Sequence, residues 1–174
     1  MLKTKDIHPP KITNFPDASV KGGKSVNENI DYKRELQLIL SQFETYSKRP
    51  QKRIITKAFN YAKQAHKGQF RSSGLPFMVH SIETAKILVD MKLDQVTIAS
   101  GLLHDIVEDT GISIADINNE FGKEIAYLVN GVTKISELKV KTQIEIQAEY
   151  FRKMIFSMSE DLRVILIKFA DRLH

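Results

Sequence analysis

Four ionisable side chains stand close together at the end of an apolar segment, residues 101–110, which reads GLLHDIVEDT. We expect this segment to be helical. On a helix, residues four apart lie on the same face, so His104 would lie over Glu108 and Asp105 over Asp109. Three carboxylates this close repel one another unless a proton or a cation compensates their charge. The segment therefore indicates a metal site.

A solvated helix end is the alternative for this segment, because helices often finish in a polar turn. The electrostatics of a helix argue against it. Carboxylates near a helix C-terminus oppose the macrodipole, so Glu108 and Asp109 occupy a costly position unless something else stabilises them. We therefore favour a functional site over a solvated helix end.

Composition limits what such a site can be. The chain has 174 residues, of which 42% are hydrophobic and 27% are charged, as in a globular protein of one domain. There is no cysteine, so a metal ion must take histidine and carboxylate ligands. No apolar run approaches the ~20 residues that span a membrane, and the N-terminus lacks the apolar core of a signal peptide. We expect a cytoplasmic protein without a membrane partner.

The chain carries an excess of positive charge, with a formal net charge of +5 and a pI of about 9.3. This excess suggests a polyanionic partner such as a nucleotide or a nucleic acid, although a solvated basic face is the more common explanation. No recognised nucleic-acid-binding motif accompanies the charge. We therefore expect no nucleic acid partner for this domain.

The elements that must position these residues are helices. Residues 1–30 combine Pro, Gly and Lys without an apolar period, which predicts a flexible leader before a domain over residues 31–174. Within the domain, helical periodicity and helix boundary signals recur, and no strand pattern is present, so the expected fold is all-α. The expected helices cover 32–46, 50–67, 79–91, 95–110, 113–121, 123–132, 143–158 and 160–174, with loops at 69–77 and 133–142.

The loop at 69–77 is rich in Ser, Gly and Pro, and it places Arg71 next to Ser72 and Ser73. A guanidinium group beside two hydroxyls can bind phosphate or stack on a base, whereas an ordinary connector is the alternative. His80 follows in the first turn of the next helix. A single histidine there is more often a surface or capping residue.

Two later segments carry further candidates. The last helix is apolar almost all round through its centre, which is typical of a core helix. Asp171 emerges from this helix, and a carboxylate in that position is expected to be paired or metal-bound. In the loop at 133–142, Lys134 can face an anionic substrate, but a solvated lysine is an equal alternative.

His80, His104 with Asp105, and Asp171 lie on three separate expected helices in the order H…HD…D. This is the ligand order of the HD metallophosphohydrolase superfamily, which the chain resembles. The surrounding segments resemble the hydrolase domain of the RelA/SpoT family, the enzymes that make and degrade the alarmone (p)ppGpp. The resemblance covers roughly residues 50–174 and rests on RSSGLPF (71–77), GLLHDIVEDT (101–110), GVTK (131–134), RKM (152–154) and RVILIKFADRLH (163–174).

The resemblance implies an HD-domain helical bundle and a Mn²⁺-dependent 3′-pyrophosphohydrolase that converts ppGpp to GDP and pyrophosphate, and pppGpp to GTP. Glu108 and Asp109 match the family's catalytic acidic pair, and Arg71 matches the arginine that packs against the guanine base. The implied metal ligands are His80, His104, Asp105 and Asp171. The expected nucleotide-binding set is Arg71, Ser72, Ser73 and Lys134.

The chain departs from the family pattern at Ser72, Leu75 and Tyr150, and these departures leave the metal set intact. Beyond the position of His174 the family continues with an Asn-Met-Arg segment, further helices and often synthetase and regulatory domains. We therefore expect the bundle to be truncated on its C-terminal side, within a longer parent chain. Two alternatives stay open: an HD phosphohydrolase of another nucleotide, and a non-catalytic fragment that binds metal or nucleotide.

Overall fold

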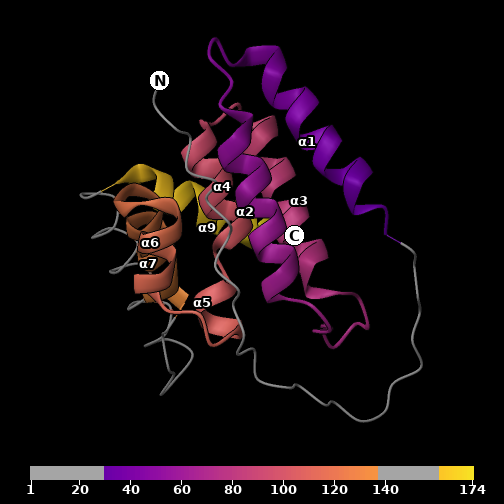
Figure 1. Ribbon diagram of the computed structural model, residues 1–174, viewed down its shortest axis with the longest axis vertical. Helices are drawn as coiled ribbons and strands as arrows, with labels where there is room; N and C mark the ends of the chain where they lie inside the picture. The colour runs from indigo at the N-terminus through magenta and orange to yellow at the C-terminus, as the bar shows by residue number, and fades with distance from the viewer. Residues whose placement is uncertain (1–29, 137–160) are drawn as a thin grey trace, which may run out of the picture.

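Helices form the regular structure of residues 30–136 and 161–174, the parts of the chain that the computed structural model describes (Figure 1). The all-α prediction is confirmed there, since the only extended pairing in these ranges is a single bridge between Phe70 and Pro76. The leader and the helix expected over 143–158 fall on residues outside the described ranges. The helices are α1 (Tyr32–Tyr46), α2 (Lys52–Ala65), α3 (Phe77–Asp90), α4 (Gln95–Leu103), α5 (Ile106–Asp109), α6 (Ile114–Phe121), α7 (Lys123–Ser136) and α9 (Leu162–Leu173).

Side chains at the helix starts explain several of these boundaries. Asp31 caps α1 by accepting hydrogen bonds from the backbone N–H groups of the first turn, and Asp94 caps α4 in the same way. Ser113 and Asp116 form a capping box at the start of α6. Gly122 then adopts φ 87°, a left-handed conformation that glycine tolerates, and separates α6 from α7.

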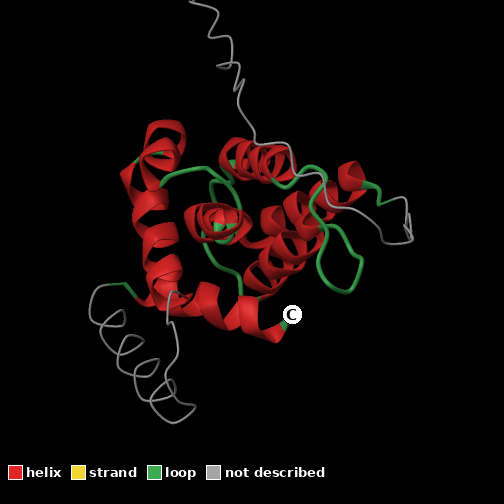
Figure 2. Cartoon of the chain, turned by 90° about the horizontal axis from the view of Figure 1, so that it is seen from below, coloured by secondary structure: helices red, strands yellow, loops and turns green. Residues whose placement is uncertain are grey.

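The centre of the bundle is α4, which contacts α2, α3, α7 and α9. In Figure 1, α1 lies on one side of this centre, and α6 and α7 lie on the other. Every residue of α4 from Thr97 to Leu103 is buried, as expected of a helix that is apolar all round. The view from below shows the surrounding helices connected by loops, with no strand in the coloured parts (Figure 2). The segment that carries His104 therefore leaves directly from the core.

Several predicted boundaries differ from the structure. The helix expected over 95–110 is broken, because α4 ends at Leu103 and a short α5 begins at Ile106. The loop expected from residue 133 is wrong at its start, because α7 continues to Ser136. Thr133 is buried there and donates a hydrogen bond to the carbonyl oxygen of Val129, so packing extends the helix. The helix expected over 160–174 begins at Leu162, and Asp161 caps it by accepting from the N–H of Arg163.

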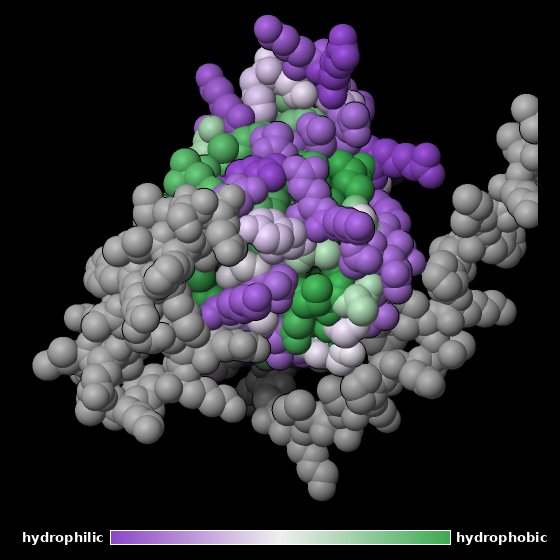
Figure 3. Space-filling model, turned by 90° about the vertical axis from the view of Figure 1, so that its left-hand side faces the viewer, coloured by the Kyte–Doolittle hydropathy of each residue, from purple (hydrophilic) through white to green (hydrophobic). Residues whose placement is uncertain are grey.

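The surface of the bundle is mixed in character. On the face shown in Figure 3, hydrophilic side chains are interspersed with smaller hydrophobic areas. Within the described ranges, no helix has both the length and the apolar character that crossing a bilayer requires.

A glycine sets the separation of α7 and α9. A Cβ atom at Gly131 would lie 2.8 Å from one methyl group of Val164 and 3.1 Å from the other. Valine is β-branched and keeps one preferred rotamer in a helix, so it cannot easily turn aside. The close approach of α7 thus helps to place α9, the helix that carries Asp171.

We expect Gly131→Ala to lower the free energy of unfolding by about 1 kcal/mol. Overpacking costs about 1–3 kcal/mol, and the better helix propensity of alanine offsets roughly 1 kcal/mol of that. Denaturant unfolding followed by circular dichroism measures the difference. Gly111→Ala is the matched control, because a Cβ atom there meets nothing within 4 Å. A Gly131→Ala midpoint at or above that of the unmodified chain would contradict the expectation.

Candidate metal centre

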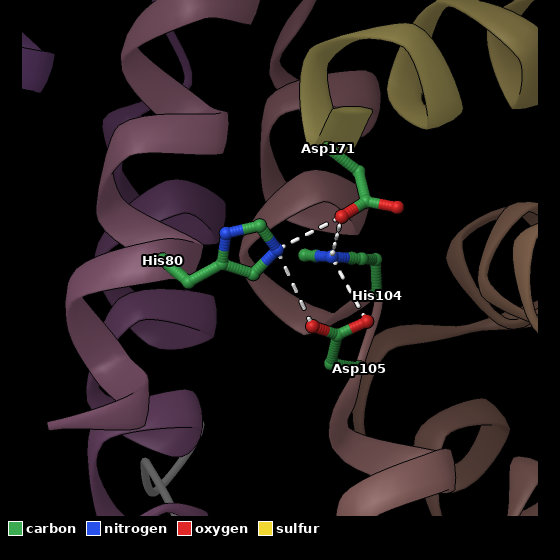
Figure 4. Close-up of side chains that lie close together, drawn as sticks. All are labelled: His80, His104, Asp105 and Asp171. Atoms are coloured by element: carbon green, nitrogen blue, oxygen red, sulfur yellow. Dashed lines mark hydrogen bonds and ion pairs between the residues drawn. The ribbon is translucent and has the colours of Figure 1, made fainter. Parts of the chain in front are cut away.

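Four side chains from three separate segments of the sequence converge in the structure (Figure 4). One ligand atom from each of His80, His104, Asp105 and Asp171 lies within 4.8 Å of all the others. His80 comes from α3, Asp171 from α9, and the other two from the break between α4 and α5. All four predicted ligands are thus brought into one group.

The break between α4 and α5 is what allows two adjacent residues to face the same point. On an unbroken helix, neighbouring side chains point about 100° apart. Here Asp105 has φ −93° and ψ −7°, and its Oδ1 lies 2.9 Å from His104 Nε2. The expected pair of side-chain ladders along one continuous helix is therefore wrong. His104 and Asp105 turn inward, whereas Glu108 and Asp109 are exposed on α5.

The hydrogen bonds of His104 orient its second ring nitrogen toward the two carboxylates. Its Nδ1 lies 2.8 Å from the carbonyl oxygen of Gly101. A carbonyl only accepts, so Nδ1–H donates and the lone pair of the neutral ring is on Nε2. This Nε2 atom is fully buried and makes no hydrogen bond among the described residues, although Asp105 and Asp171 oxygens lie at 2.9 and 3.6 Å. A lone pair facing carboxylates requires a proton or a metal ion between them.

His80 faces the same two carboxylates from the other side. Its Nε2 lies 2.9 Å from Asp171 Oδ1 and 3.5 Å from Asp105 Oδ2, and its Nδ1 lies 3.0 Å from His174 Nδ1. The side chain is almost completely buried. His80 is therefore not the surface or capping histidine that its position in the first turn suggested.

The ionisation of the group follows from its burial and its pairing. Burial alone lowers the pKa of His104, but the carboxylates of Asp105 and Asp171 raise it to about 10. Burial would raise the pKa of Asp171, yet His104, His80 and Lys168 hold it well below its usual range. The pKa of Asp105 is also lowered, since its interaction with His104 outweighs burial. Two carboxylates beside two imidazoles form a set that can hold a divalent metal ion.

Lys168 is a member of this cluster that sequence reasoning missed. Its Nζ lies 2.6 Å from Asp171 Oδ2, and the residue is only 8% exposed. The contact holds one oxygen of Asp171, while the other oxygen faces the two histidines. The sequence does contain a signal, since a lysine three residues before Asp171 interrupts an otherwise apolar stretch. Buried lysines are rare unless they are paired.

The predicted catalytic pair lies on the short helix α5, which begins directly after the candidate ligand Asp105. Glu108 and Asp109 are both exposed on α5. Partial burial of its carboxyl group and the negative charge of Asp105 raise the pKa of Asp109, while His66, His104 and Arg71 oppose the rise. Asp109 is thus close enough to Asp105 to sense its charge. The residue as a whole remains accessible to solvent.

The loop that carries Arg71 has a defined conformation. Arg71 N–H donates to the carbonyl oxygen of Leu75, and Gly74 N–H donates back to that of Arg71, each at 2.8 Å. Gly74 has φ 85°, which favours glycine. The Arg71 guanidinium lies 6.0 Å from the centre of the Phe77 ring, on the exposed tip that also holds Ser72 and Ser73. The loop is therefore a tight turn, with its cation near enough to influence Asp109.

Lys134 is exposed in the last turn of α7. This helix packs against α4 and α9, the two helices that lead to His104 and Asp171. The nucleotide-binding role of Lys134, like that of the Arg71 turn, stays a prediction.

The chain is similar to a known domain family and to several longer bacterial proteins. A family model described as HD domain matches residues 58–174. The bifunctional (p)ppGpp synthase/hydrolase SpoT of Escherichia coli K12 is 48% identical over 131 residues, which are 75% of this chain and 19% of that protein. A GTP pyrophosphokinase of Myxococcus xanthus is 48% identical over 132 residues, 74% of this chain and 17% of that protein. The chain thus spans less than a fifth of the length of either relative.

Solved structures give a consistent result. One reported as a metazoan ortholog of SpoT that hydrolyzes ppGpp superimposes with a TM-score of 0.54 and 29% sequence identity. The match covers 69% of this chain and 66% of that one. The helical fold expected from the sequence is therefore found in a solved relative.

Proposed function

We propose a function for this chain, which belongs to the HD-domain family. It hydrolyses the 3′-pyrophosphate of (p)ppGpp and releases pyrophosphate and GDP or GTP. One observation carries the proposal: two buried histidines, His80 and His104, and two partly buried aspartates, Asp105 and Asp171, form a group next to the short helix α5, which exposes Glu108 and Asp109. The similarity to proteins named as guanosine-3′,5′-bis(diphosphate) 3′-pyrophosphohydrolases of Escherichia coli O157:H7 and Vibrio cholerae supports this substrate.

The proposed cofactor is Mn²⁺, with these four side chains as its ligands. The two carboxylates supply the oxygen ligands that suit Mn²⁺, and the two imidazoles complete a mixed nitrogen and oxygen set. When bound, Mn²⁺ would polarise the phosphate and lower the pKa of the attacking water. The backbone carbonyl of Gly101 keeps the Nε2 lone pair of His104 directed into the group, and Lys168 fixes the orientation of the Asp171 carboxylate.

Glu108 and Asp109 are the proposed proton-handling residues. A carboxylate within reach of the attacking water can orient it and accept its proton. The raised pKa of Asp109 makes this carboxylate a better proton acceptor than an ordinary aspartate. The water oxygen forms a new bond to phosphorus, the bond from phosphorus to the ribose 3′-oxygen breaks, and that oxygen takes up a proton as pyrophosphate leaves.

The proposed nucleotide contacts lie on the Arg71 turn and at the end of α7. The guanidinium of Arg71 can stack on the guanine base, while Ser72 and Ser73 offer hydroxyl groups beside it. Lys134 supplies a positive charge for the phosphates. We assign residues 31–174 to the hydrolase domain, residues 1–30 to a leader, and the whole to a longer cytoplasmic chain, in which synthetase and regulatory domains are possible.

A direct assay tests the proposed reaction. The chain is incubated with ppGpp and Mn²⁺, and GDP and pyrophosphate are measured. Release of both products supports the proposal. Cleavage of another nucleotide but not of ppGpp would assign a different HD phosphohydrolase. Binding of ppGpp and Mn²⁺ without cleavage would indicate a non-catalytic binding domain.

Mn²⁺ is expected to stabilise the fold, because the group holds ligands from three separate segments. At a concentration one hundred times its Kd, a ligand that binds only the folded state adds about 2.7 kcal/mol. For a chain of this size, each kcal/mol raises the unfolding midpoint by about 2–4 °C. A thermal scan with Mn²⁺, repeated after EDTA, measures the shift. An equal shift in His104→Ala would show that the ion binds elsewhere.

A further inference from the structure

His66 lies where α2 ends and the chain enters the loop at 69–77. It is buried, with 3% of its surface exposed, and its ring lies nearly parallel to that of Phe77, at 5.7 Å between centres and 17° between planes. Its Nδ1 lies 2.8 Å from Oε1 of Gln69. Buried polar atoms are normally hydrogen-bonded, so this contact is expected to hold the ring in place. Neither His66 nor Gln69 is among the proposed metal ligands, proton-handling residues or nucleotide contacts.

Gln69 connects His66 to the helix of the acidic pair. Its Nε2 lies 2.9 Å from the backbone carbonyl oxygen of Asp109. That carbonyl can only accept, so the amide nitrogen of Gln69 must face it. The amide oxygen then faces His66, which requires Nδ1 of His66 to carry the proton. The chemistry of the carbonyl alone therefore fixes the direction of both hydrogen bonds.

The contact between Gln69 and the Asp109 carbonyl is at the C-terminal end of α5, where the helix lacks hydrogen bonds of its own. This helix has four residues, and Asp109 is the last of them. The last carbonyl groups of a helix have no donor within the helix, and very short helices are marginal without tertiary contacts. Gln69 supplies a donor from a distant segment. The position of the Asp109 backbone is thereby tied to the end of α2.

The backbone of Gln69 is itself well anchored. Its N–H donates to the carbonyl oxygen of His66, and its own carbonyl accepts from the N–H of Phe77, each at 3.1 Å. Arg71 follows two residues later in the same loop. The same anchored part of the loop therefore carries Arg71, which is proposed to stack on the guanine, and Gln69, whose side chain holds α5.

We propose that His66 and Gln69 are positioning residues for Asp109. The inference rests on the proposed function, because it gives Asp109 a proton to accept. His66 orients the amide of Gln69, and Gln69 holds the carbonyl end of α5, so that the Asp109 carboxylate stays at the distance that the attacking water requires. The same contact links the nucleotide-binding loop to the acidic pair.

Two substitutions of Gln69 test the contact. Gln69→Ala removes it, and Gln69→Glu keeps the shape but places a carboxylate against the Asp109 carbonyl. Both are expected to lower kcat roughly ten- to hundredfold, the scale of small misplacements in an active site, while KM for ppGpp and the affinity for Mn²⁺ stay unchanged. Gln64→Ala, an exposed glutamine on α2, is the matched control and keeps the full kcat.

Substitutions of His66 separate positioning from general packing. His66→Ala is expected to lower kcat as Gln69→Ala does, and the double variant to lower it no further, because both remove one linkage. His66→Asn keeps an N–H donor close to the place of Nδ1. It is therefore expected to recover most of the lost kcat.

A readout without substrate or metal distinguishes this inference from the reaction itself. Amide hydrogen exchange of residues 106–110 in the metal-free chain should become faster in Gln69→Ala, while exchange within α4 stays slow. Wild-type kcat in Gln69→Glu, a His66→Asn variant as impaired as His66→Ala, or equally accelerated exchange in α4 would each overturn the inference. If the unmodified chain does not cleave ppGpp, the proposed reaction fails. The exchange of residues 106–110 then decides whether the linkage exists.

Discussion

His104→Ala is expected to abolish Mn²⁺ binding and, with it, the hydrolysis of ppGpp. The ring is completely buried, and its Nε2 lone pair faces Asp105 and Asp171. Even the outer hydrogen-bonding partners of metal ligands are worth about 10- to 100-fold in affinity, so the loss of a ligand should exceed that range. Calorimetric titration with Mn²⁺ measures the affinity, and release of pyrophosphate measures the activity.

The variant also leaves Asp105 without its nearest partner and removes one of the positive groups that face Asp171. Breaking a buried charge pair costs about 3–5 kcal/mol, so folding must be checked by circular dichroism. His104→Gln keeps a polar side chain of similar reach and serves if His104→Ala does not fold. Undiminished Mn²⁺ affinity in a folded variant would contradict the assignment of His104 as a ligand.

Glu108→Gln and Asp109→Asn should instead keep the metal and lose the reaction. Both carboxylates are exposed on α5, outside the group of four. Positioned acids and bases typically contribute about 10²- to 10⁴-fold to a rate. We expect kcat to fall within this range, while Mn²⁺ affinity stays that of the unmodified chain. Single-turnover assays at saturating Mn²⁺ measure the chemical step.

Glu44→Gln provides the control for removal of a surface carboxylate. Glu44 lies on α1 and pairs with Lys52, and exposed pairs of this kind contribute little to stability. It should leave kcat unchanged. If Glu108→Gln or Asp109→Asn lost Mn²⁺ as completely as His104→Ala, the separation between ligands and proton-handling residues would be wrong.

Local sequence signals determined much of the fold. The capping side chains Asp31, Asp94 and Ser113 stand at the start of three helices, and each accepts a hydrogen bond from a backbone N–H group of the first turn. These interactions span only a few residues, so they can be recognised without knowledge of the rest of the chain. The boundary after α7 could not be recognised in this way, because burial of Thr133 extends that helix.

The sequence also determined the chemistry that is available for the site. Without cysteine, a metal must take histidine and carboxylate ligands, and the order of His80, His104, Asp105 and Asp171 identified the candidates. The exact neighbours of these residues could not be derived. Periodicity predicted one helix through residue 110, whereas the chain breaks at His104 and Asp105 so that both side chains face the same point.

Tertiary structure alone decided the burial of His80, the contact of Lys168 with Asp171, and the link from His66 through Gln69 to Asp109. Each depends on segments 40 or more residues apart, except the contact within α9, whose burial depends on the helices around it. Such contacts arise from the packing of helices, which a local pattern does not encode. The sequence therefore determined which residues can bind a metal and move a proton, and packing decided which of them meet.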